Sequence, residues 1–378
     1  MIAESSSVAG GGHILHVAQP TDAGVHRYVL AAATHQQEQG WGVSVACPEA
    51  GSLSGDVRRA GVAWHRWEAS RDPGRSVPAE IRELADLVHR VKPDVVHLHS
   101  SKAGLVGRLA LRGRVPTLFQ PHGWSWLAAS GGQARAARMW ERRAARWADT
   151  IVCVGDGEAE LGRRAGVRNL VVVRSGVDLT WFKPATTAEA SAAAASLNLN
   201  REDPVVLCPG RITRQKGQDV LLQAWEGVRR TCPTAQLVLL GDGDLPVQGL
   251  PDRVRRDQAV ADVRLHYAAA DVVVLPSRWE GLALTAIEAL ASGCSLVGTD
   301  VPGLSELVRT GHGQVVPSDD PTALAAALSR RVLDLSSTRM EGERAAVVAQ
   351  GFDVRRTHAA LLDLTVGVMR SHRRPVAI

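Results

Sequence analysis

A strand-turn-helix pattern between residues 271 and 293 constrains the fold of this 378-residue chain more than any other stretch. Asp271 to Leu275 is an apolar, β-branched run of strand length, and Pro276 ends it. From about Thr285 the apolar residues recur with helical spacing until Gly293 stops the pattern. A buried strand that leads directly into an amphipathic helix is the repeating unit of a parallel α/β sheet.

The turn in this pattern carries groups that suit a ligand. Two carboxylates, Glu280 and Glu288, bracket it, and Gly281 lets the backbone come close to another molecule. The free N–H groups around the helix start belong to Leu282, Ala283, Leu284 and Thr285. Open α/β sheets bind ligands at this edge, and a helix N-terminus favours an anion, so the turn suits a phosphorylated sugar. Acidic residues beside a helix start also act as caps or dipole partners, and that alternative stays open.

Strands and helices alternate along the rest of the chain. The apolar runs predict strands at residues 13–19, 43–47, 62–67, 95–98, 116–121, 151–154, 170–174, 205–208 and 236–240. Helical spacing predicts helices at residues 25–39, 78–91, 133–148, 321–332 and 355–369, and one more after Lys216. We therefore expect an α/β protein with parallel sheets that have helices on both faces.

Composition bounds the function. The length allows two domains with substantial cores, and the Ala- and Ser-rich residues 186–197 are interpreted as the segment between them. No apolar run reaches the ~20 residues of a membrane span, and the first residues lack a signal-peptide pattern, so a cytoplasmic location is expected. The five cysteines show no metal-ligand spacing and are expected to be reduced, mostly buried thiols. The net charge of +5 is too diffuse to predict nucleic-acid binding but suits an anionic substrate.

Polar residues follow several predicted strands of the first half. His99 and Ser100 end one strand and are expected near a ligand, whereas His97 lies within that strand and is expected in the core. His122 follows another strand. Trp124 beside it either stacks on the ring of a second substrate or covers the core. The loop after the first strand does not provide the glycine pattern that a dinucleotide site requires.

Two spaced motifs resemble those of the retaining glycosyltransferases of family 4. Glu280 and Glu288 match the family's Glu-x7-Glu pair, and residues 209–217 match its G-R-x4-K segment. Residues 175–178, 268–271 and 298–300 also resemble the family's pattern, as do Phe182 and Pro184. The resemblance implies the GT-B fold, with two Rossmann-like, doubly wound parallel-sheet domains that face a cleft. It places an acceptor-binding domain at residues 1–185, a nucleotide-sugar donor domain at 186–350 and a helix that crosses back to the first domain at 351–378.

The resemblance also assigns roles to residues. Those implied to hold the donor diphosphate are Gly24, Arg211, Lys216, Leu284 and Thr285. The transferred sugar would contact Glu280, Gly281, Leu282 and Ala283, with His122 close to it as a second catalytic residue. Glu288 would accept hydrogen bonds from the ribose hydroxyls. The residues implied for the acceptor are His26, His99, Ser100 and Trp124.

Retention of anomeric configuration follows from the same resemblance. No metal is expected, because Arg211, Lys216 and a helix N-terminus can meet the charge that grows on the diphosphate. The sequence Asp242-Gly243-Asp244 has the form of an Asp-x-Asp metal motif but is interpreted as a turn. The expected enzyme moves a hexose from UDP, or next from GDP, to a hydroxyl group in cell-surface saccharide or secondary-metabolite biosynthesis. A nucleotide-sugar epimerase of the same fold and a non-catalytic nucleotide-sugar-binding protein are the alternatives.

Residues 133–148 form an Arg-rich amphipathic pattern with two interpretations. A basic amphipathic helix can bind an anionic membrane peripherally. The same pattern also describes a helix with one solvated face and one face packed on a sheet, and this second interpretation is favoured. The sequence carries no prediction of the oligomeric state.

Overall fold

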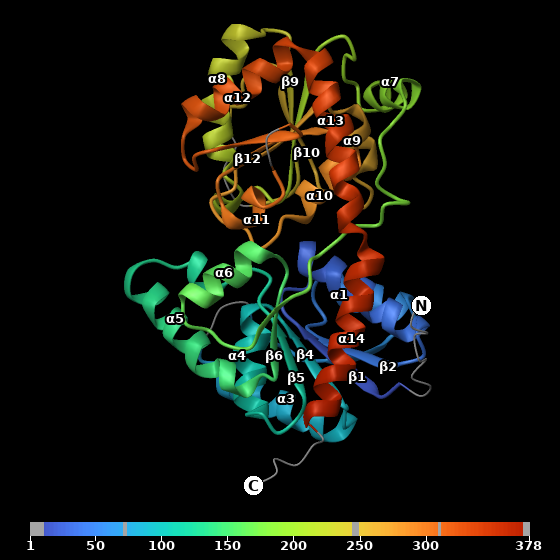
Figure 1. Ribbon diagram of the computed structural model, residues 1–378, viewed down its shortest axis with the longest axis vertical. Helices are drawn as coiled ribbons and strands as arrows, with labels where there is room; N and C mark the ends of the chain where they lie inside the picture. The colour runs from blue at the N-terminus through green and yellow to red at the C-terminus, as the bar shows by residue number, and fades with distance from the viewer. Residues whose placement is uncertain (1–10, 71–73, 244–248, 309–310, 373–378) are drawn as a thin grey trace, which may run out of the picture. The chain divides into compact units, whose positions relative to one another are not determined.

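The structure is a computed structural model that describes residues 11–70, 74–243, 249–308 and 311–372. The chain divides into two compact units, each built on one parallel sheet (Figure 1). Unit 1 comprises residues 1–154, 158–173 and 357–378, and unit 2 comprises residues 155–157 and 174–356. The predicted domain boundaries lie after residues 185 and 350, whereas the chain passes between the units near residues 173 and 356.

Unit 1 has a seven-stranded sheet in the order β3-β2-β1-β4-β5-β6-β7, in which every pairing is parallel. The strands are β1 His13–Ala18, β2 Gly42–Cys47, β3 Ala63–Arg66, β4 Val95–His99, β5 Thr117–Gln120, β6 Thr150–Cys153 and β7 Leu170–Val172. Figure 1 shows β1, β2, β4, β5 and β6 side by side as the central layer of this unit. The direction of the strand order reverses between β1 and β4, which is the ligand-binding switch point of such sheets.

Helices cover both faces of this sheet. They are α1 Ala23–Glu38, α2 Leu53–Arg59, α3 Val77–Val91, α4 Ser100–Leu111, α5 Gly131–Ala144, α6 Asp156–Arg164 and α14 Val354–His372. Neighbouring residues of β1 serve opposite faces, because Ile14 packs in a cluster with α1 and α14, and Leu15 packs in a cluster with α3 and α4. α14 packs in the same cluster as Ile14 through Leu361, Val368 and Met369.

Unit 2 has a six-stranded parallel sheet in the order β10-β9-β8-β11-β12-β13. The strands are β8 Val205–Pro209, β9 Gln236–Leu240, β10 Val254–Asp257, β11 Val272–Leu275, β12 Ser295–Thr299 and β13 Gly313–Val316. Its helices are α7 Thr187–Ser196, α8 Gln218–Thr231, α9 Arg264–Ala269, α10 Leu284–Ala291, α11 Pro302–Ser305, α12 Pro321–Leu333 and α13 Leu335–Ala349. The order again reverses once, between β8 and β11.

The predicted strands and helices are confirmed to within a few residues at their ends, and several helices were not predicted. Residues 186–197 are one case, because they form α7, which Thr186 and Glu189 begin with a reciprocal capping box. Four of the five free cysteines are buried, and Cys232 is partly buried. Within the described ranges no helix combines the length and apolar character that a membrane crossing requires.

Candidate active site

The main candidate site lies at the switch point of the unit 2 sheet. β8 and β11 are hydrogen-bonded neighbours, so the loops that follow them emerge side by side at the carboxyl edge. The loop after β8 carries Arg211 and Lys216, and the loop after β11 carries Glu280 and leads into α10 with Glu288. The fold thus brings together two motifs that are about 64 residues apart in the sequence.

An ion pair joins the two loops. Lys216 Nζ lies 2.6 Å from Glu280 Oε1, and the Ser277 hydroxyl donates to the same carboxylate oxygen at 2.7 Å. The two charged side chains are 15% and 8% exposed, so the pair is shielded from water while it remains reachable from one side. A shielded lysine with three donors can hold a carboxylate and an anionic ligand at once.

Gly217 allows the two loops to approach this closely. Its φ is +70°, and a Cβ placed on it would lie 2.0 Å from the carbonyl oxygen of Pro276. Any other residue would push the loop after β8 away from the end of β11 and separate Lys216 from Glu280. The glycine in the G-R-x4-K-G segment is therefore a steric requirement of the site.

The loops are also tied together by groups that the sequence did not single out. Gln215 donates through Nε2 to the carbonyl of Trp279 at 3.0 Å, and the Arg278 backbone N–H donates to the carbonyl of Gln215 at 2.8 Å. The Arg278 guanidinium binds both carboxylate oxygens of Asp219 at 2.9 and 2.8 Å, and it also contacts Asp319 at 2.7 Å. These bonds hold the pair of loops as one rigid element.

Glu288 is held from behind by Tyr267. The tyrosine hydroxyl donates to Glu288 Oε2 at 2.9 Å, and the carboxylate is 3% exposed. The Tyr267 ring in turn packs edge-on against Phe182, which belongs to the segment that follows residues 175–178. Tyr267 was not predicted, and its position directly before residues 268–271 was the available signal.

The remaining donor-site residues surround this pair. Leu284 and Thr285 open the first turn of α10, where helical geometry leaves backbone N–H groups without intrahelical acceptors. Gly281 lies against Gly303 of α11, because a Cβ placed on Gly303 would lie 2.5 Å from the carbonyl oxygen of Gly281. The Ala283 N–H donates to the Gly303 carbonyl at 3.4 Å. Arg211 is half-buried, and its carbonyl accepts a hydrogen bond from Gln218 at 3.1 Å.

Unit 1 has its own switch point, where the predicted residues of the first half gather. Gly24 is the second residue of α1, in the loop-to-helix junction after β1, and a Cβ there would meet nothing within 4 Å. His99 ends β4, Ser100 begins α4 and His122 follows β5 with φ at +53°. His122 Nε2 lies 3.1 Å from His99 Nδ1, so the structure joins two of the predicted residues directly. Desolvation lowers the pKa of His122 to about 3, so its ring is neutral at physiological pH.

Other predicted acceptor residues are placed differently. His99 is 0% exposed and Trp124 is 2% exposed, so neither offers a surface to an acceptor. Trp124 stacks on Trp126 with ring centroids 4.5 Å apart and donates to the Glu158 carbonyl at 2.7 Å, which selects the core-covering interpretation. His26 lies on α1 with Nε2 2.7 Å from Asp56.

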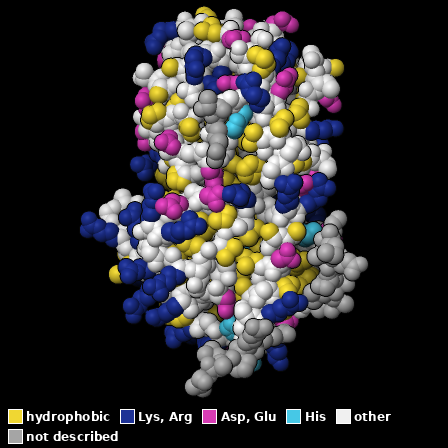
Figure 2. Space-filling view, viewed as in Figure 1, with side chains coloured by type: hydrophobic (Ala, Val, Ile, Leu, Met, Phe, Trp, Pro, Cys, Tyr) yellow, Lys and Arg dark blue, Asp and Glu magenta, His cyan; other side chains and the backbone are white. Residues whose placement is uncertain are grey.

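The Arg-rich helix α5 has one packed face and one basic face. Ala134 and Ala144 are buried, and the buried Glu141 pairs with Arg108 at 2.7 Å. Met139 is apolar, but it is 69% exposed and lies beside the exposed Arg138. Figure 2 shows dark-blue basic side chains gathered over the region of α5. The exposed arginines there are Arg135, Arg138, Arg142 and Arg143 of α5, and Arg146 in the turn that follows it.

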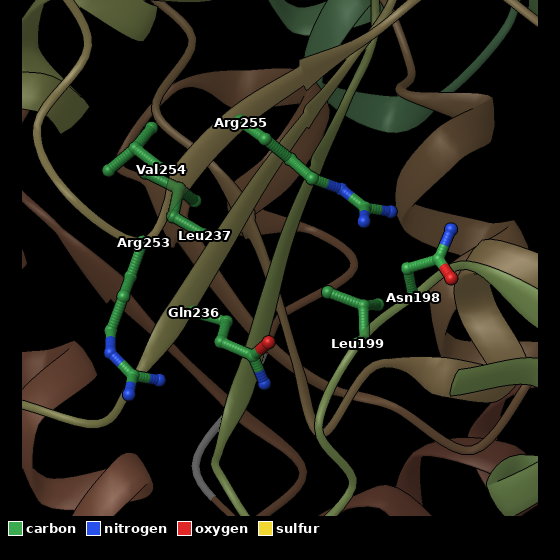
Figure 3. A pocket seen from close by; sticks show the side chains of 7 residues that line it. All are labelled: Asn198, Leu199, Gln236, Leu237, Arg253, Val254 and Arg255. Atoms are coloured by element: carbon green, nitrogen blue, oxygen red, sulfur yellow. The ribbon is translucent and has the colours of Figure 1, made fainter. Parts of the chain in front are cut away.

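Two cavities in the described residues lie away from these sites. The cavity in Figure 3 has a volume of about 250 Å³, and it lies where β9 and β10 begin rather than where they end. Arg253 and Arg255, which line it, are engaged with Asp203 and Asp257. The other, of about 410 Å³, lies between the ends of α3 and α4. Neither contains a predicted site residue.

Two doubly wound parallel-sheet units are the architecture of the GT-B fold, which many glycosyltransferases share. Comparison with known proteins agrees. Residues 203–334 match the family model of glycosyl transferases group 1, and residues 23–176 match that of the glycosyl transferase 4-like domain. The chain belongs to this glycosyltransferase family.

Curated relatives carry the same assignment, and a solved structure shares the fold. The chain is 33% identical over 311 residues to the D-inositol 3-phosphate glycosyltransferase of Streptomyces bingchenggensis, covering 74% of this chain and 68% of that protein. It is 34% identical over 188 residues to the lipopolysaccharide core biosynthesis mannosyltransferase LpcC of Rhizobium leguminosarum, covering 46% and 53%. The crystal structure of Anabaena HepE in complex with UDP and glucose superposes with a TM-score of 0.81 at 20% identity, covering 94% of this chain and 100% of HepE.

Proposed function

We propose that this glycosyltransferase moves a hexose from a nucleoside diphosphate, UDP first and GDP next, to a hydroxyl group with retention and without a metal. The observation that carries the proposal is the Lys216–Glu280 pair at the switch point, 2.6 Å apart and beside the first turn of α10. It sets a cation and free N–H groups for a diphosphate next to a carboxylate for sugar hydroxyls. The complex of HepE with UDP and glucose supports UDP as the first choice.

Each side chain has a distinct task in this proposal. Arg211 binds two diphosphate oxygens, and Lys216 adds a point charge. The stabilisation that Lys216 gives increases as negative charge moves onto the leaving group. Glu280 accepts hydrogen bonds from the transferred sugar. Glu288, oriented by Tyr267, accepts them from the ribose. These two cations and the N-terminus of α10 supply the electrostatic stabilisation that a divalent metal supplies elsewhere.

Retention is proposed to proceed on one face of the sugar. The departing phosphate helps to deprotonate the acceptor hydroxyl while the sugar passes through an oxocarbenium-like state. His122 stays neutral in this scheme because its pKa is lowered, so it serves the sugar as a hydrogen-bonding group. Product anomers read by NMR test retention, and trapping of a covalent glycosyl-enzyme would refute the one-face route.

Calorimetric titration of UDP, GDP, ADP and dTDP, with and without EDTA, tests the donor site. Wild type is expected to bind one nucleotide irrespective of EDTA, and Arg211→Ala is expected to lose at least about tenfold in affinity. Arg214→Ala is the matched control, because Arg214 is exposed on the same loop. Binding that needs a metal, or that falls equally in both variants, contradicts the proposal. Product analysis separates a transferase from the epimerase alternative.

The acceptor is proposed to be a hydroxyl-bearing carbohydrate or lipid-linked saccharide at a membrane surface. The observation that favours a membrane is the exposed face of α5, where Met139 lies among four exposed arginines and a fifth follows in the next turn. A basic face with an apolar side chain binds anionic lipid headgroups. Sedimentation with phosphatidylglycerol vesicles is expected to carry wild type down. Vesicles of phosphatidylcholine alone, or a variant with Arg138→Gln and Arg142→Gln, are expected not to.

A further inference from the structure

Four histidines from three different segments of unit 1 gather at the switch point of its sheet. His16 lies on β1, His97 and His99 lie on β4, and His122 follows β5. The first three are at most 1% exposed, and His122 is half-buried. The parallel pairing of β1 with β4 sets His16 directly beside His97, and the ring centroids of His97 and His99 are 4.0 Å apart. Buried polar groups normally have hydrogen-bond partners, so the donor and acceptor role of each of these ring nitrogens has to be assigned.

Three of these rings form one continuous hydrogen-bonded chain that begins at an amide. Gln36 Oε1 of α1 lies 2.7 Å from His16 Nε2. His16 Nδ1 lies 2.9 Å from His99 Nε2, and His99 Nδ1 lies 3.1 Å from His122 Nε2. Every ring nitrogen of His16 and His99 is thus used inside the chain, and His122 is its end.

The amide oxygen gives the chain a direction. The amide is placed with its oxygen toward His16, while its nitrogen is buried without a hydrogen-bond partner among the described residues. In this placement the oxygen accepts, so His16 carries its proton on Nε2 and its bare Nδ1 accepts from His99. A neutral His99 then has its proton on Nε2 and accepts through Nδ1, so His122 donates through Nε2. Burial lowers the pKa of His16 to about 4 and lowers the pKa of His99 well below its usual value, which keeps both rings neutral. The last ring is left with a bare Nδ1.

We propose that the chain Gln36–His16–His99 fixes His122 as the Nε2–H tautomer and presents its Nδ1 as a hydrogen-bond acceptor for a hydroxyl group of the bound sugar. The ligand role rests on the proposed function, whereas the tautomer does not. Gln36, His16 and His99 are positioning residues, because they act on the sugar only through His122. An acceptor nitrogen selects a group that can donate, so a hydroxyl is bound and a fluorine at the same position is not.

His97 provides the matched control for this chain. It lies on the same strand as His99 and is equally buried, but neither of its ring nitrogens has a hydrogen-bond partner among the described residues. His16, His97 and His99 also each offer a nitrogen within 4.8 Å of the others, a spacing that a metal ion could use. The bond between His16 Nδ1 and His99 Nε2 argues for the chain, because those two nitrogens point at each other rather than at a shared centre.

The first test is the tautomer of His122 in the protein without substrate, read from long-range ¹H–¹⁵N correlation spectra of ¹⁵N-histidine-labelled protein. Wild type and His97→Leu are expected to show a bare Nδ1 and a protonated Nε2 at His122. Gln36→Met removes the acceptor that sets the direction and is expected to give a mixture of tautomers. A protonated Nδ1 in wild type, an unchanged signal in Gln36→Met, or stoichiometric Zn²⁺ binding that His97→Leu abolishes would each overturn the proposal.

The second test concerns the sugar. UDP-hexose analogues with one hydroxyl replaced by fluorine, position by position, are compared with the parent in binding and turnover. At one position, fluorine is expected to lower binding and turnover about tenfold or more in wild type and His97→Leu. The same replacement is expected to have a much smaller effect in Gln36→Met and His122→Leu. Equal losses in all four proteins would overturn the sugar contact. If the tautomer is as expected but no nucleotide sugar binds, the proposed function fails and the tautomer assignment stands.

Discussion

Acidification is expected to destabilise unit 1 specifically, because its three fully buried histidines must stay neutral. His16, His97 and His99 are 0–1% exposed, and desolvation lowers all three pKa values, that of His16 to about 4. An unfolded histidine has a pKa of about 6.5. Between these values the unfolded chain binds protons that the folded chain does not, so the free energy of unfolding falls as the pH falls. The contribution is fully present above about pH 6.5 and is lost progressively below it.

The size of the effect follows from the number of histidines. At about pH 5.5, one unit below the unfolded pKa, each neutral buried histidine costs about 1.4 kcal/mol of stability relative to about pH 7.5. Three of them cost about 4 kcal/mol, a large share of the ~5–15 kcal/mol that stabilises a typical domain. Among the groups that face them, Tyr28 does not titrate in this range, because desolvation raises its pKa to about 12. His122 adds a loss of about the same size per residue, because desolvation lowers its pKa to about 3.

Urea unfolding at the two pH values, followed by deuterium exchange in peptides from β1 and β4, measures the loss in unit 1 alone. His97→Leu removes one of the three groups without breaking a hydrogen bond, so its pH-dependent loss is expected to be smaller by about 1.4 kcal/mol. Peptides from β8 and β11 serve as the internal control. Equal losses in wild type and His97→Leu, or equal losses in the two units, would refute the reasoning.

Three further predictions concern charged pairs. Lys216→Ala is expected to weaken nucleotide binding about tenfold or more in calorimetry, whereas Lys216→Arg retains most of it. Glu280→Gln is expected to lower the turnover number about a hundredfold in a transfer assay while nucleotide affinity is kept or rises, because it releases Lys216 from a competing carboxylate 2.6 Å away. Arg108→Met is expected to lower the free energy of unfolding in urea by ~3–5 kcal/mol, because it leaves Glu141 buried without its partner. The double variant Arg108→Met, Glu141→Leu is expected to regain most of that loss. A double variant as unstable as Arg108→Met alone would contradict this.

The predicted strands were correct because they carry their own signal. β11 is an apolar run rich in valine, and β4 has three apolar residues among its five; both strands are buried on both faces. Such patterns can be recognised without knowledge of the neighbouring strands. The carboxyl ends of these strands could then be named as ligand-binding positions. The spaced carboxylates Glu280 and Glu288 could be found for the same reason, because both belong to one strand-turn-helix unit.

Helix α4 was missed because its glycines resemble helix breakers. Gly104 lies against Phe119, where a Cβ would meet the ring at 2.2 Å, and Gly107 lies against Leu98, where it would meet the side chain at 2.4 Å. The glycines are there to let the helix pack closely on the sheet, and that reason exists only in the folded protein. By contrast, α7 could have been predicted, because the Thr186-x-x-Glu189 capping box is visible in the sequence.

The histidine chain could not be predicted for a topological reason. His16 and His99 are 83 residues apart, and they meet only because β1 and β4 are neighbours in the strand order of the sheet. His97 was correctly predicted to lie in the core, but its ring nitrogens have no hydrogen-bond partner among the described residues. Periodicity reveals which residues are buried along one strand, whereas it says nothing of which buried side chains face each other across two.

The two switch points differ in charge. In unit 2 the switch point holds a cation and a carboxylate close together, so it can bind a diphosphate and meet the charge that develops on it. In unit 1 the corresponding position is filled by imidazoles that burial keeps neutral. A neutral acceptor binds a hydroxyl without drawing an anion, and it does not compete for the diphosphate. The two switch points therefore differ in electrostatic character, although both lie where the strand order of a doubly wound parallel sheet reverses.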